Sequence, residues 1–457
     1  MTTPHRRTLR IAAATATLAL LAAACSSSSS KSSSSGATPT TGASATTAGG
    51  SSPATTSGPN QASAPGITAT EIKIGSHQPL TGVAAPGYSE IAPAANAYFQ
   101  YVNAHGGVNG RKITFTFLDD GYNPANTTSV VRQLVLQDGV FAIFDGLGMP
   151  THLAVRDYLN SEKIPDLFVA SGCSCWNDPS KAPYTFGFQT DYIVEGEIQG
   201  QYIKQNFSGM KVGYFTQNDD FGQDGIKGLD TQVPAASVVS RQTYVPSAAG
   251  IAGVGAAISA LQAAGAQVVV SYSVPLFTTL ALKAAAKIGY KPTWVVSNVG
   301  SDPATLKGNL GTDAGLMEGI VTDAYLNNIY DSTNPWTQLF KQVHDQYDAQ
   351  APLDGNVEYG MASAYVFVQA LLAAGQNPTR DGIVKAIENS HFTGPGLVPF
   401  SYSATDHQGY TGEIMGTIKS GAFVPTGTPY TATDTGNIQA YTTAPPTPPA
   451  NGIPTAG

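Results

Sequence analysis

Residues 267–297, QVVVSYSVPLFTTLALKAAAKIGYKPTWVVS, decide the fold class of this chain. Residues 267–272 are rich in β-branched side chains and predict a buried strand. Residues 276–288 predict a helix, and residues 293–297 predict a second strand. A strand, a helix and a strand in this order are typical of a parallel sheet with a crossover helix.

The same alternation extends outward from this stretch in two runs, and the rhythm restarts after Tyr192. We expect strands at residues 71–75, 112–118, 141–144, 166–170, 211–216 and 237–245. We expect helices at residues 93–104, 151–160, 193–206 and 253–264, with further helices that begin near Pro124 and Phe221. Two runs of such units predict an α/β fold with two doubly wound lobes, because the chain is too long for one core.

The first 25 residues are typical of an export signal. Arg6, Arg7 and Arg10 supply the positive charge that precedes the apolar part of a signal peptide. Residues 11–24 are uncharged and mostly Ala and Leu, and they are too short to span a bilayer as a helix. We therefore expect an exported protein with residues 1–25 as its signal peptide. The adjacent arginines leave both the general secretory route and the twin-arginine route open.

The signal ends at Cys25, which follows three alanines. Small residues before a cysteine resemble a bacterial lipobox, in which the cysteine is lipidated and becomes the first residue of the mature protein. Ala22 departs from that pattern, which usually has Leu there, so a plain secretory signal cleaved near Ala24 is the alternative. We expect lipidation of Cys25 and a location on the outer face of the cell membrane.

Two segments have the composition of disordered chain. Residues 26–65 contain no aromatic residue, no aliphatic residue larger than Ala and a single charge, Lys31. Such a segment has no apolar surface to offset the entropy of ordering, so we expect a flexible tether. Residues 442–457 are rich in Pro and Thr, and we expect a disordered tail there.

The charge balance bears on the choice of partner. The chain carries 31 acidic and 23 basic residues, a formal net charge of −8. All of the acids follow residue 70, whereas four of the basic residues precede it, so the remaining chain is more acidic still. An acidic surface argues against binding to nucleic acid and against direct adhesion to anionic lipids. We expect no nucleic-acid partner.

Five short motifs occur in an order that resembles a known family. They are IKIG at residues 72–75, QPLTG at 78–82, GGVNGRKI at 106–113, DDGYNP at 119–124 and NDDFG at 218–222. Together they resemble the branched-chain amino-acid-binding family of periplasmic proteins, the type I solute-binding proteins of ABC transporters. The resemblance extends from about Ile72 to Tyr410. Fold-level likeness implies ligand capture but no particular ligand.

The resemblance implies two discontinuous lobes joined by a three-strand hinge. The first lobe would comprise residues 66–190 and 326–390, and the second would comprise residues 191–325 and 391–441. We expect the lobes to close around a small molecule, and a monomer to deliver it to the permease of an ABC importer. A ligand-binding sensor subunit of a membrane receptor would have the same lobes, so the sequence leaves both functions open.

Ligands of parallel sheets bind beyond the carboxyl ends of the strands, so candidate residues are sought in the loops that follow strands. Backbone N–H groups at Gly148 precede a predicted helix and suit an anionic or carbonyl group. The resemblance places Ser171 and Cys173 near the groups that hold a ligand carboxylate, although a thiol is a poor donor. The full set of ligand-binding candidates is Tyr88, Gly148, Met149, Thr151, Ser171, Cys173, Phe221, Tyr272, Asn298 and Tyr325.

Asn298 is the most informative of these candidates. Family members that bind amino acids tend to have an acid near this position, which neutralises the ligand's ammonium group. A buried ammonium without a partner is costly. Either Asp302 or Asp323 supplies the charge from elsewhere, or the ligand has no α-ammonium group. We expect the second case, with an amide, an organic acid or another small polar molecule as ligand, and retain an amino-acid-like ligand as the alternative.

Motifs for catalysis or metal binding are missing from the sequence. It has no P-loop, no nucleophile elbow and no zinc-protease motif. A calcium-loop-like stretch that begins at Asp220 has Thr231 in place of the final acid. Cys173 and Cys175 do not have the spacing of zinc ligands. They could form a small disulfide or remain two free thiols, and the sequence leaves both alternatives open. We expect no enzyme, no catalytic residue, no metal and no cofactor.

Overall fold

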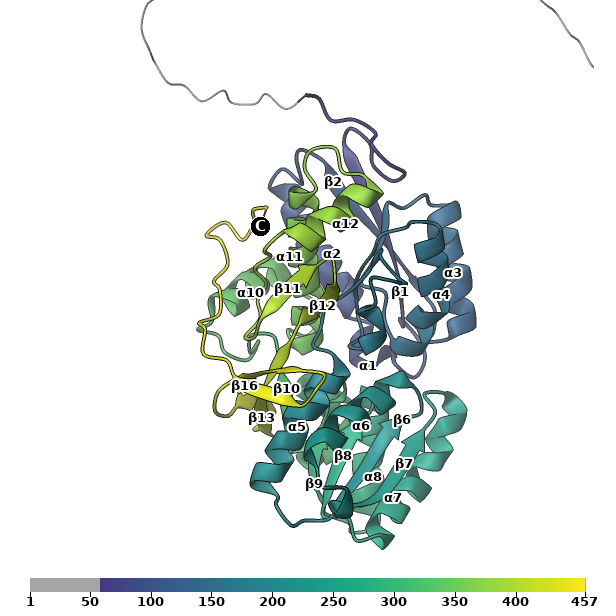
Figure 1. The fold of residues 1–457 in the computed structure, drawn as a ribbon, viewed down its shortest axis with the longest axis vertical. Helices are drawn as coiled ribbons and strands as arrows, with labels where there is room; N and C mark the ends of the chain where they lie inside the picture. Colours follow the sequence, from purple (N-terminus) through teal and green to yellow (C-terminus); the bar gives the residue numbers. More distant parts are fainter. Residues whose placement is uncertain (1–57, 457) are drawn as a thin grey trace, which may run out of the picture. The chain divides into compact units, whose positions relative to one another are not determined.

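The computed structural model describes residues 58–456. Within this range the strands form a five-stranded sheet, a nine-stranded sheet and a two-stranded sheet. The two large sheets lie in the upper and lower halves of Figure 1. Cys25, the predicted signal peptide and most of the predicted tether lie outside the described residues.

The first large sheet is entirely parallel, with the strand order β2-β1-β3-β4-β5. Its strands are β1 (Glu71–Gln78), β2 (Lys112–Asp119), β3 (Ala142–Phe144), β4 (Asp166–Val169) and β5 (Thr185–Gly187). Around it lie α1 (Ala85–Tyr88), α2 (Ile91–Ala104), α3 (Pro124–Leu136), α4 (Met149–Ser161), α10 (Pro335–Tyr347), α11 (Gly355–Ala373) and α12 (Arg380–Asn389). We call these elements the first lobe.

The second large sheet is mixed. Its strands are β6 (Val212–Gln217), β7 (Val238–Tyr244), β8 (Val268–Tyr272), β9 (Thr293–Val296), β10 (Val321–Ala324), β13 (Gly412–Lys419), β14 (Ala422–Pro425), β15 (Tyr430–Thr433) and β16 (Asn437–Ala440). Strands β6 to β10 pair in parallel, and β13 adds to β10 in antiparallel fashion. With α5 (Tyr192–Asn206), α6 (Asp220–Gln232), α7 (Val254–Ala263), α8 (Pro275–Lys287) and α9 (Pro303–Leu310), they make up the second lobe.

Alternation along β8 explains how the second sheet is covered on both faces. Val268, Val270 and Tyr272 pack in a cluster with residues of α5 and α6, whereas Val269 packs with residues of α7 and α8. Side chains of period two point to opposite faces, so a strand buried on both sides reads as a continuous apolar run. The predicted α/β fold of two lobes is confirmed, and the predicted strands and helices match the observed ones to within a few residues.

Two helices of the second lobe pack unusually close together. A side chain on Gly196 of α5 would collide with the backbone of α6, and a side chain on Gly228 of α6 would collide with the backbone of α5. Glycine on both sides lets the two helix backbones approach each other directly. The sequence between residues 192 and 232 therefore specifies the spacing of α5 and α6 as well as their helical state.

The segment 391–411 lies elsewhere than predicted. We expected it in the second lobe, but β11 (Phe400–Ser403) and β12 (Asp406–Tyr410) form a hairpin against β5 of the first lobe. The Tyr402 hydroxyl donates to the carbonyl of Gly187, and the His407 ring lies stacked on Phe186. Aromatic packing on β5 holds the hairpin there, so the chain enters the second lobe only at β13.

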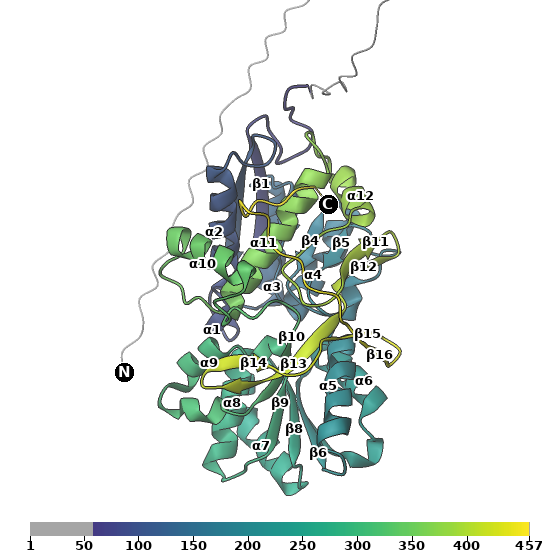
Figure 2. The same cartoon turned by 90° about the vertical axis from the view of Figure 1, so that its left-hand side faces the viewer.

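Both ends of the described chain are attached to the first lobe, although composition predicted disorder. The Trp336 indole donates to Pro446, and the hydroxyls of Tyr101 and Tyr98 donate to Asn451 and Gly452. The prediction of a disordered tail is therefore wrong for these residues. The tail is held in place because it accepts hydrogen bonds from donors on α2 and α10 that would otherwise be buried without partners. Figure 2 shows the yellow C-terminal segment running along the first lobe.

Arg111 fixes the start of the folded body. Its guanidinium is almost fully buried and donates to the carbonyls of Thr68, Gln61 and Gln376 and to the side chain of Asn377. Hydrogen bonds to four acceptors offset the free-energy cost of burying the charged guanidinium group. Residues 58–65, which we expected to belong to a flexible tether, are thus joined to the loop between α11 and α12.

A chain of four titratable side chains crosses the core of the first lobe. His77 Nδ1 lies 2.9 Å from Asp120, His77 Nε2 lies 2.9 Å from His152 Nδ1, and His152 Nε2 lies 2.9 Å from Asp166. All four are buried, and burial lowers the pKa of His77. The paired carboxylates satisfy the outer ring nitrogens, so the chain links β1, α4 and β4 without a loose donor.

Candidate functional site

A cavity lies between the two lobes at the carboxyl ends of their parallel strands. Its volume is about 170 Å³. Leu147 and Ala170 follow β3 and β4 of the first lobe, while Val274 and Asn298 follow β8 and β9 of the second. This is where α/β sheets bind ligands, because the strand ends leave a crevice between diverging loops.

The wall of the cavity is mainly aromatic. Its aromatic members come from both lobes and from the segments between them, and they are Tyr88, Tyr122, Tyr192, Phe221, Tyr325, Tyr330, Tyr359 and Phe423. Tyrosine offers an apolar ring together with a hydroxyl, so such a wall suits a ligand that is largely apolar and has a few polar atoms.

Six of the predicted ligand-binding residues are brought together in this cavity. They are Tyr88, Gly148, Met149, Phe221, Asn298 and Tyr325. Each lies in the loop or the helical segment that follows a strand, and the six residues come from both lobes. The remaining four predicted residues are absent from the lining, and each has another contact in the structure.

Thr151 and Tyr272 are held in the protein interior. The Thr151 hydroxyl donates to the carbonyl of Leu147, four residues earlier in the chain, and is therefore engaged within the protein. Tyr272 is fully buried, and its ring lies where a side chain on Gly225 of α6 would be. Tyr272 therefore packs beneath Phe221 and contributes no surface to the cavity.

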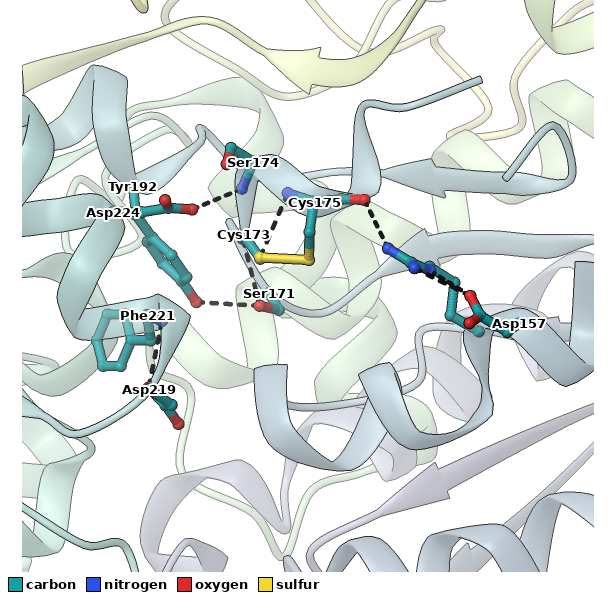
Figure 3. Close-up of a disulfide and its surroundings, with 10 residues drawn as sticks. Asp157, Ser171, Cys173, Ser174, Cys175, Tyr192, Asp219, Phe221 and Asp224 are labelled. Atoms are coloured by element: carbon teal, nitrogen blue, oxygen red, sulfur yellow. Dashed lines mark hydrogen bonds and ion pairs between the residues drawn. A yellow bond between two sulfur atoms is a disulfide. The ribbon is translucent and has the colours of Figure 1, made fainter. Parts of the chain in front are cut away.

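Ser171 and Cys173 lie in a loop that a disulfide closes. Cys173 is bonded to Cys175, which settles the alternative between a disulfide and free thiols for the described structure. The Ser171 hydroxyl lies 3.4 Å from the Tyr192 hydroxyl and 3.4 Å from the backbone nitrogen of Cys173. Figure 3 shows Ser171 and the disulfide beside Tyr192.

The same loop contacts the second lobe. The backbone N–H of Ser174 donates to Asp224 of α6 over 2.9 Å, as drawn in Figure 3. On the other side, Arg156 of α4 donates to the carbonyl of Cys175. The disulfide loop therefore bridges α4 in the first lobe and α6 in the second.

Other hydrogen bonds join the two lobes directly around the cavity. The Tyr88 hydroxyl donates to the carbonyl of Val299 over 2.6 Å, and the backbone N–H of Gly355 donates to Asp302 over 3.1 Å. The amide of Asn356 donates to Thr305 over 2.9 Å. These contacts require the lobes to be close together, so the structure represents the closed arrangement.

Three carboxyl groups belong to the cavity wall: Asp302, Asp323 and Glu358. The expectation of a ligand without an ammonium group rested on Asn298 replacing an acid. The structure supplies acids from other positions, so that argument does not hold. Asp302 caps α9 by accepting from Thr305 and also accepts from the Tyr330 hydroxyl.

Asp323 is part of a buried group of acids centred on Asn298. The Asn298 amide donates to Glu195, Asp323 and Glu413, with distances of 3.2, 3.0 and 3.2 Å. Burial raises the pKa of Asp323 to about 6, and burial with the neighbouring carboxyls raises the pKa of Glu195 and Glu413 well above the usual range. Like charges in one site cannot all ionise, so protons are shared within the group.

Several residues that line the cavity were not identified as candidates from the sequence. Tyr122 occupies a left-handed backbone conformation after β2, and Tyr359 and Glu358 lie on α11, whose residues up to Leu371 are buried on every side. An acid within a helix is usually solvent-exposed, so Glu358 carried no signal. Tyr192 immediately follows residues 188–191, where the chain passes from the first lobe to the second. The restart of the strand–helix alternation after Tyr192 was the sequence feature that could have indicated a position near the cavity.

Among residues 58–456, no group of three or more His, Cys, Asp or Glu side chains is placed to hold a metal ion. None of the helices in residues 58–456 is long and apolar enough to cross a membrane.

Two lobes that close over a cavity at their strand ends define a solute-binding protein. The chain belongs to the periplasmic binding protein family, whose model matches residues 71–422. It is 23% identical over 332 residues to a Leu/Ile/Val-binding protein homolog of Brucella abortus, which covers 70% of this chain and 80% of that protein.

Solved structures share the fold. A branched-chain amino acid ABC transporter protein from Thermus thermophilus with bound valine has a TM-score of 0.71 at 21% identity, covering 80% of this chain and 98% of the other. A fatty acid ABC transporter substrate-binding protein from Thermomonospora curvata has a TM-score of 0.70 at 22% identity, covering 82% and 96%. These structures share the fold, and the match to the family model confirms the resemblance seen in the sequence motifs.

Proposed function

We propose that this chain is an exported lipoprotein that captures a small molecule between its lobes and delivers it to the permease of an ABC importer. The observation that carries the proposal is the cavity itself, which has walls from both lobes and is surrounded by direct bonds between them. A ligand that touches both lobes stabilises only the closed arrangement, and closure is a signal that a membrane partner can read.

The anchor is proposed at Cys25, after the signal peptide, with the protein held at the outer face of the cell membrane. The protein acts as a monomer and needs no cofactor. The ligand is a largely apolar molecule with a few polar atoms, because the wall is aromatic with a small set of carboxyl and amide groups. A ligand without net negative charge, such as an amide, an amine or an amino-acid-like molecule, fits this description better than an organic acid, whose negative charge would lie among carboxyls.

Capture is tested by thermal unfolding of the purified protein against amino acids, amides, amines, organic acids and polyols. A ligand at 100 times its dissociation constant adds about 2.7 kcal/mol of stability, which shifts the melting temperature by a few degrees. Small-angle scattering on each hit then reports closure. A failure of every compound in the panel to raise the melting temperature would contradict the proposal.

Anchoring and delivery have separate tests. Radiolabelled palmitate should label the wild-type chain in the bacterium and not the Cys25→Ser variant. Ligand-loaded protein should stimulate ATP hydrolysis by the reconstituted importer, and the ligand-free protein should not. A labelled Cys25→Ser variant would exclude the anchor, and an unresponsive importer would favour a receptor-associated sensor.

A further inference from the structure

The ionisable groups of the cavity wall that could carry a full charge at neutral pH are all acids. Asp302, Asp323 and Glu358 line it, and the described wall contains no Lys, Arg or His. A cavity enclosed by protein strengthens electrostatic interactions relative to water. The wall therefore favours a positively charged group and disfavours a negatively charged one.

Glu358 has unused hydrogen-bonding capacity. Its side chain belongs to α11, the residue is 3% exposed, and its Oε1 atom has no hydrogen-bond partner within the structure. The hydroxyl of Tyr359, the next residue in the cavity wall, also lacks a partner. A buried polar atom left without a partner is costly, so these two atoms are suited to a donor from a ligand.

The aromatic wall supports the same ligand charge. Tyr88, Tyr192, Phe221, Tyr325 and Tyr359 surround the space that the carboxyls border. The face of an aromatic ring carries negative charge density and attracts ammonium groups, most strongly where water is excluded. A cavity lined by both aromatic rings and carboxyl groups suits an organic cation whose remaining atoms are apolar.

Several donors near the cavity that could serve a carboxylate are already used within the protein. The first turn of α4 points an N-terminus toward the cavity, but Gly148 N–H donates to Ala170, Pro150 has no N–H and the Thr151 hydroxyl donates to Leu147. Cys173 is in the disulfide and offers no S–H. A ligand carboxylate would thus meet no cation in the wall, and at the helix terminus it would find only the backbone N–H groups of Met149 and Thr151, opposed by the carboxyls of the wall.

We propose that the cavity selects a protonated organic amine that carries no carboxylate, with its ammonium group toward Glu358 and its apolar part among the tyrosines. The inference rests on the proposed function and specifies its ligand class. The ammonium group supplies up to three donors, and Glu358 and Tyr359 have the acceptors for two of them.

Two matched series of compounds test the ligand class on the wild-type protein by titration calorimetry. The first series is leucine, isoamylamine, which lacks the carboxylate, and isocaproate, which lacks the amine. The second series is phenylalanine, phenethylamine and hydrocinnamate. We expect at least one amine to bind about tenfold or more tightly than its parent amino acid, with no binding of either acid.

Tighter binding of an amino acid or an acid than of its matched amine would overturn the inference and leave solute binding intact. Binding of neither amine would also overturn it. The broader unfolding screen decides separately whether the protein captures any solute, so the two proposals fail in distinguishable ways.

A matched pair of variants tests the role of Glu358. Glu358→Gln keeps the shape and removes the charge, and we expect it to weaken amine binding about tenfold or more, since a desolvated charge pair is lost. Glu162→Gln, on an exposed residue after α4, should leave binding unchanged. Unchanged binding in a folded Glu358→Gln variant would overturn the assignment. If Glu358→Gln does not fold, the two compound series on the wild-type protein decide the ligand class.

Discussion

The phenolic hydroxyl of Tyr88, in the first lobe, donates to the backbone carbonyl of Val299, in the second lobe, over 2.6 Å. The residue is 8% exposed, so the bond is shielded from water. It exists only when the loop that follows β1 is close to the loop that follows β9. Tyr88 therefore contributes to closure as well as to the cavity wall.

Tyr88→Phe should shift the protein toward the open arrangement. The variant keeps the ring and removes a single hydrogen bond, which contributes about 0.5–1.5 kcal/mol. Ligand affinity should fall by a factor of about 2 to 10, and small-angle scattering should report a larger radius of gyration without ligand. Tyr347→Phe, on α10 and outside the cavity wall, is the control. Unaltered affinity and radius in Tyr88→Phe would show that the bond does not govern closure.

Asp323 should make stability depend on pH. Burial raises its pKa to about 6, above the value of about 3.9 expected in an unfolded chain. The folded state then binds more protons than the unfolded state between these values, so the stability from this group is present below about pH 4 and is lost as pH rises through about 6. Glu195 and Glu413, which share the Asn298 amide with it, shift in the same direction.

Denaturant unfolding of wild type and Asp323→Asn across this pH range checks the effect. The free energy of unfolding of the wild type should decrease relative to the variant as pH rises from about 4 to about 7. A difference that stays constant over the range would mean that Asp323 is ionised in the folded protein. Amine binding should in turn become tighter as the carboxyls ionise.

The disulfide should contribute modestly to stability. It closes a loop of only three residues, Cys173 to Cys175, and chain-entropy arguments give about 1–2 kcal/mol for so short a loop. The double variant Cys173→Ser, Cys175→Ser should lose that amount in denaturant unfolding. Its affinity for ligand should also fall, because the loop that holds Ser174 against Asp224 is less constrained. A double variant as stable as the wild type, with equal affinity, would contradict both statements.

Close packing of α5 on α6 should not tolerate an added methyl group. Gly228→Ala places a carbon against the backbone of α5, and overpacking of this kind costs about 1–3 kcal/mol. Gly308→Ala on α9, where nothing lies within 4 Å of the new atom, should be neutral or slightly stabilising. Equal stabilities of the two variants, measured by thermal unfolding, would refute the packing argument.

Local patterns predicted the strand–helix units because burial on both faces of a parallel sheet produces apolar runs, as in Val268–Val270. They also indicated Tyr88, Gly148 and Asn298, which line the cavity; contact of these residues with a ligand stays a prediction. They could not place Glu358 or the hairpin at residues 400–410, since these depend on packing against other segments of the chain, as in the bond from Tyr402 to Gly187. Tyr272 shows the same limit: its position at a strand end was right, but it faces α6 instead of the cavity.

The bonds of Arg111 have a mechanical consequence. They join Gln61 and Thr68 to the loop at Gln376 and Asn377, and all of these partners belong with the first lobe. A restraint applied to the chain ahead of residue 58 is therefore transmitted to the first lobe, not to the second. The anchor proposed at Cys25 would therefore hold the first lobe near the membrane and leave the second lobe to move relative to it.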